Sequence, residues 1–273
     1  MTVFETTGQV ALRVSLSGGE VSIETIDAPR VEIELVALRD NDVTRQAIEE
    51  ARVEMTDRGG GHQVVVELKR RSGFLVGRGP RIGVEVRCPA GTDVDLRADS
   101  ADLEARGPLG AVEVKTASGD VSLDAARTLT VNTASGEVRA GDIDGRVEVR
   151  TASGDVRVRR SGGELSASLV SGDLAVDDAA AGLDVTTVSG DVEVRAAGGG
   201  RIRVQAVSGD VELGIKPGER LYIDASSVSG TMSSELGLED SPPTGSTAPV
   251  SELRVRTISG DLKIARAGFA VSS

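Results

Sequence analysis

The chain has 273 residues, a formal net charge of −12 and a sequence pI of about 4.7. Proteins that bind nucleic-acid phosphates normally carry a basic stripe, so this charge argues against nucleic acid as a partner. Aromatic residues make up only 1% of the chain, so base-stacking and sugar-stacking sites are poorly supplied.

The sequence contains no apolar run long enough to cross a membrane. Its start, MTVFETTGQV, lacks the basic and apolar regions of a signal peptide. A single cysteine, Cys88, excludes an internal disulfide. We therefore expect a cytoplasmic protein, with association with the cell envelope as the alternative.

Residues 1–80 form an irregular N-terminal region. Alternation of apolar and polar residues predicts strands at 9–16, 20–26, 31–38 and 63–70. The segment NDVTRQAIEEARVEM, residues 41–55, is the one good helix candidate, with Asn41 or Asp42 as its N-cap and Met55 at the end of its apolar face. A stack of strands leaves unpaired edges at its ends, so we expect this helix and its neighbouring strands to cap the region that follows.

A basic and apolar cluster stands at the end of this region, in the segment LKRRSGFLVGRGPRI. Arg70, Arg71 and Arg78 surround Phe74 in an otherwise acidic protein. One interpretation is a hairpin tip that contacts an anionic lipid surface or an acidic partner. The alternative is an ordinary hairpin with a Gly-rich turn.

Residues 81–233 repeat one phrase, seen as TASGDVSL from residue 116 and TVSGDVEV from residue 187. Its Ser-Gly pairs recur at intervals of mostly about 18 residues, at Ser118, Ser135, Ser153, Ser171, Ser189, Ser208, Ser229 and Ser259. Alternating aliphatic residues on both sides of each pair predict two short strands joined by a corner. Such a unit cannot bury its apolar face alone, whereas stacked units can. We therefore predict an all-β, single-stranded parallel β-solenoid of about nine coils, right-handed because parallel crossovers are.

Stacking places equivalent residues above one another in columns. We expect Gly at the corner because a tight turn often needs a positive φ. The residue before each Ser is small at first and larger later, at Ala117, Ala134, Ala152, Val170, Val188, Val207, Val228 and Ile258. We interpret these residues as an inward-facing column that widens along the stack, with drift of the repeat along the chain as the alternative. An acidic residue follows the Ser-Gly pair, at Asp102, Asp120, Glu137, Asp155, Asp173, Asp191, Asp210 and Asp261, and Thr231 interrupts the series. We predict that these carboxylates accept backbone amide hydrogen bonds, with calcium binding as the alternative.

The stretch 234–252 is polar, rich in Pro, Ser and Thr, and lacks periodicity. It is predicted to be a mobile loop insertion. The repeat resumes at Leu253, and residues 253–273 form a last coil and a tail that includes Phe269.

No catalytic, cofactor-binding or metal-binding residue is predicted. His62 is the only histidine, which argues against a metal site built from histidines, and Cys88 is interpreted as structural. Triple glycines occur without the Gly-Lys-Ser/Thr of a phosphate loop. Paired carboxylates leave a polysaccharide-active β-helix enzyme as an alternative.

The repeated phrase T-x-S-G-D-[VL]-x-[VL] resembles the bacterial β-strand-repeat family of unknown function labelled "putative adhesin". The resemblance covers about residues 10–35 and 81–266. It implies a single-chain β-solenoid, no catalytic residues, and relatives at the cell surface. We therefore expect a non-enzymatic scaffold that binds a protein partner, with a cell-surface adhesin as the alternative.

Overall fold

The computed structural model describes residues 1–68, 80–217, 220–236 and 250–268. The predicted contact residues Arg70, Arg71, Phe74 and Arg78 lie outside the described residues, as do most of the predicted loop insertion and Phe269. The chain divides into two compact units, Met1–Gly141 and Asp142–Ser273. Both consist mainly of parallel β-strands in a solenoid-like arrangement, so the prediction of an all-β protein is confirmed at this level.

The first unit contains β1 (Thr2–Glu5), β2 (Gln9–Ile26), β3 (Arg30–Ala37), the helix α1 (Asp42–Glu49), β4 (Arg52–Arg58), β5 (Gly61–Glu67), β6 (Ile82–Pro89), β7 (Asp93–Ser118), β8 (Val121–Ser135) and most of β9 (Val138–Ile143). The second unit contains β10 (Val147–Ser153), β11 (Val156–Ser161), β12 (Leu165–Ser171), β13 (Leu174–Ala179), β14 (Leu183–Ser189), β15 (Val192–Ala197), β16 (Ile202–Ser208), β17 (Val211–Ile215), β18 (Arg220–Ser229), β19 (Met232–Ser234), β20 (Val250–Ser259) and β21 (Leu262–Arg266).

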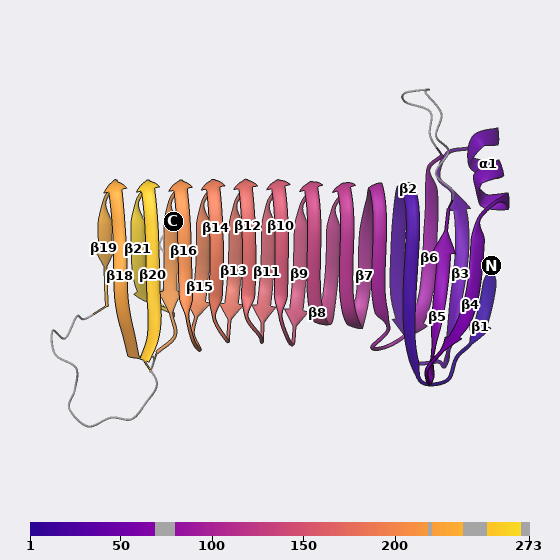
Figure 1. Ribbon diagram of the computed structural model, residues 1–273, viewed down its shortest axis with the longest axis horizontal. Helices are drawn as coiled ribbons and strands as arrows, with labels where there is room; N and C mark the ends of the chain where they lie inside the picture. The colour runs from indigo at the N-terminus through magenta and orange to yellow at the C-terminus, as the bar shows by residue number, and fades with distance from the viewer. Residues whose placement is uncertain (69–79, 218–219, 237–249, 269–273) are drawn as a thin grey trace. The chain divides into compact units, whose positions relative to one another are not determined.

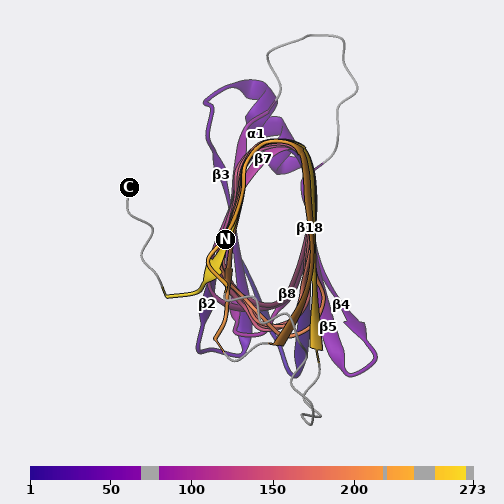
Figure 2. The ribbon, with the colours of Figure 1, turned by 90° about the vertical axis from the view of Figure 1, so that its left-hand side faces the viewer.

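The strands of the second unit stack in register, as the repeat predicts. The even-numbered strands β10, β12, β14 and β16 pair in parallel, and this pairing aligns Ser153 with Ser171, Ser189 and Ser208. The odd-numbered strands β11, β13, β15 and β17 form a second parallel row. Seen along the stacking direction, each coil of this unit has an elongated cross-section, with one row of strands on each long side (Figure 2). Its interior holds the aliphatic residues of each alternating pair, such as Leu183 and Val185, which are fully buried.

The stacking order departs from the chain order at the end of the second unit. β20 pairs with β16 on one side and with β18 on the other, and β21 pairs likewise with β17 and β19. The coil 250–266 therefore lies between the coils 202–215 and 220–234, an order that Figure 1 shows in the sequence of labels β16, β20, β18. The coils at this end therefore do not stack in the order in which they follow one another along the chain.

The composition of the two coils explains this order. Coil 250–266 supplies large inward-facing residues, among them Leu253 and Leu262, both of them buried. In register with the buried Val255 and Ile264 of that coil, coil 220–234 has only Ala225 and Ser234. A coil at the end of a stack has a neighbour on one side only, so the coil with the weaker apolar face occupies that place at the lower cost in free energy.

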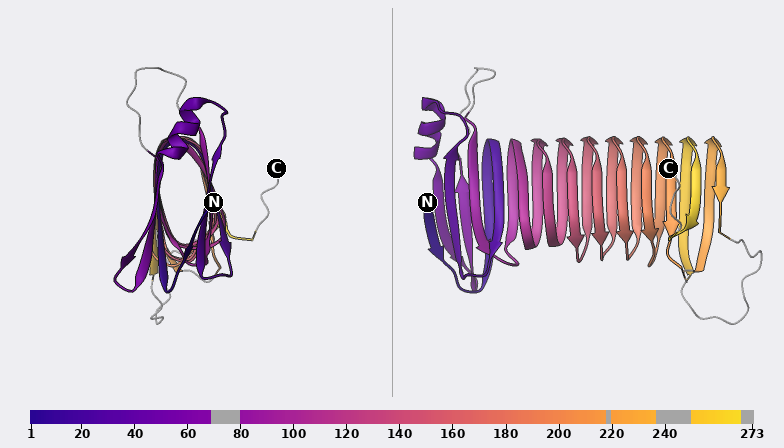
Figure 3. Two further views of the ribbon diagram at one scale, coloured as in Figure 1. Left: turned by 90° about the vertical axis from the view of Figure 1, so that its right-hand side faces the viewer. Right: turned by 180° about the vertical axis from the view of Figure 1, so that it is seen from behind.

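The same interleaving occurs in the first unit. β2 pairs in parallel with β5 and β6 on one side and with β7 on the other. Beyond β5 and β6 the sheet continues with antiparallel pairs, β3 with β6, β1 with β3, and β4 with β5 (Figure 3).

The helix α1 is shorter than predicted. Asn41 is its N-cap, as expected, and its side-chain Oδ1 accepts a hydrogen bond from the Thr44 amide at 2.7 Å. The helix ends at Glu49, whereas the prediction extended to Met55. Met55 belongs instead to β4 and pairs with Val64 of β5, so strand pairing overrides the helical pattern there.

Candidate functional site

The Ser-Gly corners of the second unit expose a row of apolar side chains. We define the aliphatic column as Val170, Val188, Val207, Ile258 and Val228, in stacking order. These side chains are between 45% and 82% exposed. The prediction that this column faces inward is therefore wrong.

Strand alternation explains why the column faces outward. In β12, Leu165, Ala167 and Leu169 are buried, so Val170 lies on the solvent face of the strand. In Figure 1 these corners lie where the arrowheads of β10, β12, β14 and β16 end and the chain turns into the second row of strands.

In several coils the threonine two residues before the corner Ser donates a side-chain hydrogen bond to the carbonyl of that Ser. The sequence analysis did not predict this contact. The Thr151 hydroxyl donates to the Ser153 carbonyl at 3.1 Å, and the Thr257 hydroxyl donates to the Ser259 carbonyl at 3.3 Å. The first unit repeats this contact between Thr116 and Ser118 at 2.6 Å. These threonines are buried, so the contact pairs a hydroxyl that is shielded from water. The Ser259 carbonyl also accepts the Gly209 amide of the adjacent coil at 3.1 Å, so the hydroxyl is its second donor. Thr187, at the same place in its coil, has no such partner among the described residues.

The carboxylates after the corner form a hydrogen-bonded ladder. We define the acidic column of the second unit as Asp155, Asp173, Asp191, Asp210 and Asp261. Each carboxylate accepts the backbone N–H of the equivalent residue one coil further along the stack, at 3.1 Å for Asp155, 2.9 Å for Asp173 and 2.8 Å for Asp191. The prediction that these acids accept amide hydrogen bonds is confirmed.

The ladder ends at the coil that ends the stack. Asp210 accepts the amide of Asp261 at 2.8 Å, and Asp261 accepts the amide of Thr231 at 2.7 Å. No described coil follows Thr231, so this position has no amide to accept. The missing acid in the sequence thus marks the terminal coil.

The first unit contains the same contact. Asp102 accepts the amide of Asp120 at 2.9 Å, and Asp120 accepts the amide of Glu137 at 2.8 Å. The ladder is therefore a property of the repeated corner in both units.

Most carboxylates of the acidic column have no cationic partner among the described side chains. Arg157 approaches Asp155 at 3.8 Å. Within the described ranges, Asp173, Asp191, Asp210 and Asp261 form no ion pair with a side chain. Carboxylates one coil apart, about 5 Å, repel by roughly 1 kcal/mol in water. The corner consequently presents a negative row beside an apolar row.

Substitutions at Asp191 should separate the hydrogen bond from the charge. Asp191→Asn keeps an oxygen that can accept the Asp210 amide and removes one repelling charge, so we expect a free energy of unfolding within about 0.5 kcal/mol of wild type. Asp191→Ala removes the acceptor and should cost about 1 kcal/mol. Urea unfolding followed by circular dichroism measures both. Equal losses in the two variants would show that the amide hydrogen bond contributes nothing.

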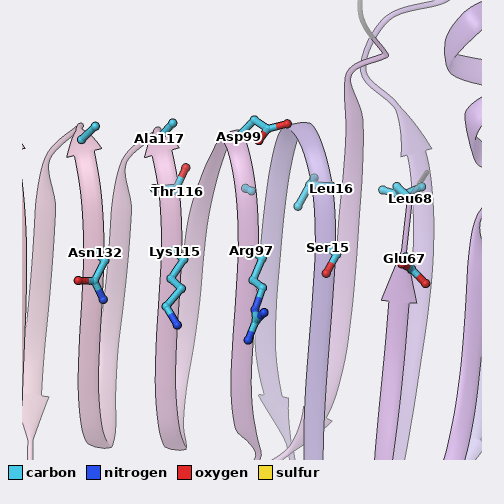
Figure 4. Close-up of a pocket in the computed structure, with 12 residues that line it drawn as sticks. Ser15, Leu16, Glu67, Leu68, Arg97, Asp99, Lys115, Thr116, Ala117 and Asn132 are labelled. Carbon is cyan, nitrogen blue, oxygen red and sulfur yellow. The ribbon is translucent and has the colours of Figure 1, made fainter. Parts of the chain in front are cut away.

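The first unit has a shallow hollow of about 860 Å³ that the sequence analysis did not predict. Figure 4 shows its polar lining as one row across β8, β7, β2 and β5, formed by Asn132, Lys115, Arg97, Ser15 and Glu67. Its cations are paired along their own strand: Arg97 Nε lies 3.1 Å from Asp95 Oδ1, and Lys115 forms an ion pair with Glu113. The hydrogen bond with Asp95 raises the pKa of Arg97. Among the described residues that line it, the hollow therefore has no concentrated charge to attract an ionic ligand.

His62 lies in β5 and links two segments. Its Nδ1 is 2.9 Å from Asp57 Oδ1, and its Nε2 is 3.2 Å from Thr7 Oγ1. The hydroxyl, imidazole and carboxylate follow the order of a hydrolytic triad, but the Asp57 side chain is 87% exposed, whereas the carboxylate of such a triad is buried. We interpret the contact as a link between the segment before β2 and the β4–β5 hairpin.

Cys88 is fully buried in β6, and this burial raises the pKa of its thiol to about 11. The thiolate is the nucleophilic form, so iodoacetamide at pH 8 should leave the native protein unmodified and label it after unfolding in urea. A raised pKa in the folded state stabilises the fold fully below the unfolded value, and this contribution is lost as the pH rises toward about 11. Rapid labelling of the native protein at pH 8 would contradict this burial.

The described residues contain no group of three or more His, Cys, Asp or Glu side chains placed to hold a metal ion. None of the helices in the described ranges is long and apolar enough to span a membrane.

Parallel coils with exposed corner columns define a solenoid-like, all-β repeat protein. The Toastrack DUF4097 family matches residues 11–265, and the chain belongs to this family. No curated protein matches the chain.

Two solved structures are similar in fold. One is described as a putative adhesin from Parabacteroides distasonis ATCC 8503, with 15% identity, a TM-score of 0.50, and coverage of 96% of this chain and 95% of that chain. The other is described as a putative adhesin from Bacteroides fragilis NCTC 9343, with 9% identity, a TM-score of 0.49 and the same coverage. At 15% identity, the similarity to the P. distasonis structure concerns the fold alone. The expected resemblance to a family of unknown function is confirmed by the match to the Toastrack DUF4097 family.

Proposed function

We propose that this Toastrack-family protein is a non-enzymatic scaffold that binds a protein partner through the aliphatic and acidic columns of its second unit. The observation that carries the proposal is the alignment of five exposed aliphatic side chains at equivalent corners. Single exposed apolar residues are ordinary, but a contiguous row beside polar residues is typical of an interaction site.

The proposal includes the finer features of the fold. The solenoid has about nine coils and is right-handed, and α1 with the antiparallel strands covers its N-terminal end. The proposed location is the cytoplasm. A second contact, with an anionic surface or an acidic partner, remains a prediction. It would be made by the cluster of Arg70, Arg71, Phe74 and Arg78.

The direct test is affinity capture from the native cell with the immobilised protein. We expect a defined partner to be retained by the wild type and lost with the double variant Val188→Ser/Val207→Ser. Val3→Ser is the matched control, because Val3 is 47% exposed but lies outside the column. Retention of the same proteins by all three forms would contradict the proposed binding surface.

The second candidate is an adhesin-like protein of the cell surface. The description of the P. distasonis structure as a putative adhesin favours it. Fractionation of the native cell, followed by protease treatment of intact cells, distinguishes the two: an adhesin is degraded from outside, and a cytoplasmic scaffold is protected.

A further inference from the structure

We infer that the corner columns of the second unit bind an amphipathic α-helix that carries an aliphatic stripe flanked by Lys or Arg. This inference rests on the proposed function and specifies the chemistry of the partner. Three properties of the corner support it, namely the spacing of the coils, the exposed apolar row and the uncompensated carboxylates.

The spacing of the coils favours a helix over an extended peptide. Parallel strands lie about 4.8 Å apart, so the four intervals from Val170 to Val228 span roughly 19 Å. Residues on one face of an α-helix recur about every 5.4 Å, so four turns span roughly 22 Å. In an extended peptide, same-face residues recur about every 6.7 Å, and four repeats span roughly 27 Å. Over the whole column, the side chains of a helix therefore shift relative to the coils by less than the spacing of one coil. Those of an extended peptide shift by more than one coil spacing.

The aliphatic column provides the apolar contact. Val170, Val188, Val207 and Ile258 are each about half exposed, so the outer part of each side chain remains in water. β-branched side chains have few rotamers, and ordering them in an interface costs little conformational entropy. The row is a ridge along the stack, which suits the groove between neighbouring i, i+4 rows of side chains on a helix that lies along it.

The acidic column determines the charge of the partner. Each aspartate follows its aliphatic residue by three positions, as Asp173 follows Val170, so the two columns run side by side. Asp173, Asp191, Asp210 and Asp261 have no ion-pair partner among the described side chains. Lys or Arg on one flank of the helix would relieve their mutual repulsion. A second copy joined through the same corner would instead bring two acidic columns together.

The test uses two synthetic helical peptides of about twenty residues, a length of roughly 30 Å. Both have a Leu stripe that recurs every turn, and they differ only in Lys or Glu along one flank. Fluorescence anisotropy with the full chain should show binding of the Lys peptide, with at least tenfold weaker binding of the Glu peptide. Binding should weaken further when the salt concentration is raised, because the carboxylates are exposed.

Two sets of variants assign the binding to the columns. Val188→Ser/Val207→Ser should weaken the affinity for the Lys peptide about tenfold through lost apolar contact. Asp173→Asn/Asp191→Asn/Asp210→Asn keeps the amide acceptors and should also weaken it about tenfold while removing most of the salt dependence. Val3→Ser should bind like wild type.

Three results would overturn the inference. These are no binding of the Lys peptide at about 1 mM, equal binding of the Lys and Glu peptides, or wild-type affinity in both column variants. A column-dependent partner in the capture experiment combined with no peptide binding would reject the helix and leave the proposed function standing. Loss of column dependence in both experiments would reject both.

Discussion

Gly190→Ala should destabilise the protein much more than Gly200→Ala, although both glycines have a positive φ, 131° and 120° respectively. An L-residue at such an angle costs about 1–3 kcal/mol in either place. A Cβ on Gly190 would also lie 2.1 Å from the carbonyl oxygen of Gly172 in the adjacent coil, whereas a Cβ on Gly200 has no atom nearer than 3.7 Å. Relieving the first contact requires two coils to separate, which breaks backbone hydrogen bonds and should bring the total loss to about 4 kcal/mol or more.

Thermal and urea unfolding followed by circular dichroism provide the comparison. Because the two variants share the backbone strain, the difference between their free energies of unfolding isolates the close approach of stacked corners. Similar losses in the two variants would mean that the corners are not in contact, and the stacked columns on which the proposed binding surface depends would be in doubt.

The second large effect concerns the order of the last two coils. Leu253 is completely buried in the coil that lies between its neighbours, and Leu253→Ala should cost about 3 kcal/mol. Ile223 lies in the terminal coil, where it pairs with Leu253 of the neighbouring coil and is only partly buried. Ile223→Ala should therefore cost about 1 kcal/mol.

Both substitutions remove a similar volume, which makes their ratio informative. A stack that followed the chain order would place Ile223 inside and Leu253 in the terminal coil, and the two losses would then be reversed. Urea unfolding of the two variants, with the exposed Val228→Ala as a control expected within about 0.5 kcal/mol of wild type, measures this directly.

The order of the coils also matters for the candidate site. Ile258 is supplied by the coil 250–266 and occupies the place between Val207 and Val228. The aliphatic column is therefore continuous only when this late segment of the chain has been inserted between two earlier ones. The proposed binding surface is therefore complete only with this C-terminal segment in place.

Much of the candidate site could be predicted from the sequence, and one error is instructive. The acidic residues and their role as amide acceptors followed from their fixed place after the corner glycine. The aliphatic column was assigned to the wrong face because its gradation in size was read as packing, whereas the alternation of Leu165, Ala167 and Leu169 already places Val170 outside. The hydroxyl contact of Thr151 is not evident from the sequence because threonine is an ordinary residue within a strand such as β10.

The form of a single coil follows from local requirements of two strands and a turn, namely the period of the repeat, the alternation around each Ser-Gly pair and the glycine at each corner. Which coil lies on which depends instead on packing between coils. Coils with the same pattern offer nearly equivalent edges, so pairing rules alone do not distinguish Leu253 from Ile223 as the neighbour of Ile202. The difference comes from the burial of whole apolar faces at the end of a stack. It shows in the sequence as the smaller or polar residues Ala225 and Ser234, and as Thr231, which replaces the acid in a coil that no described coil follows.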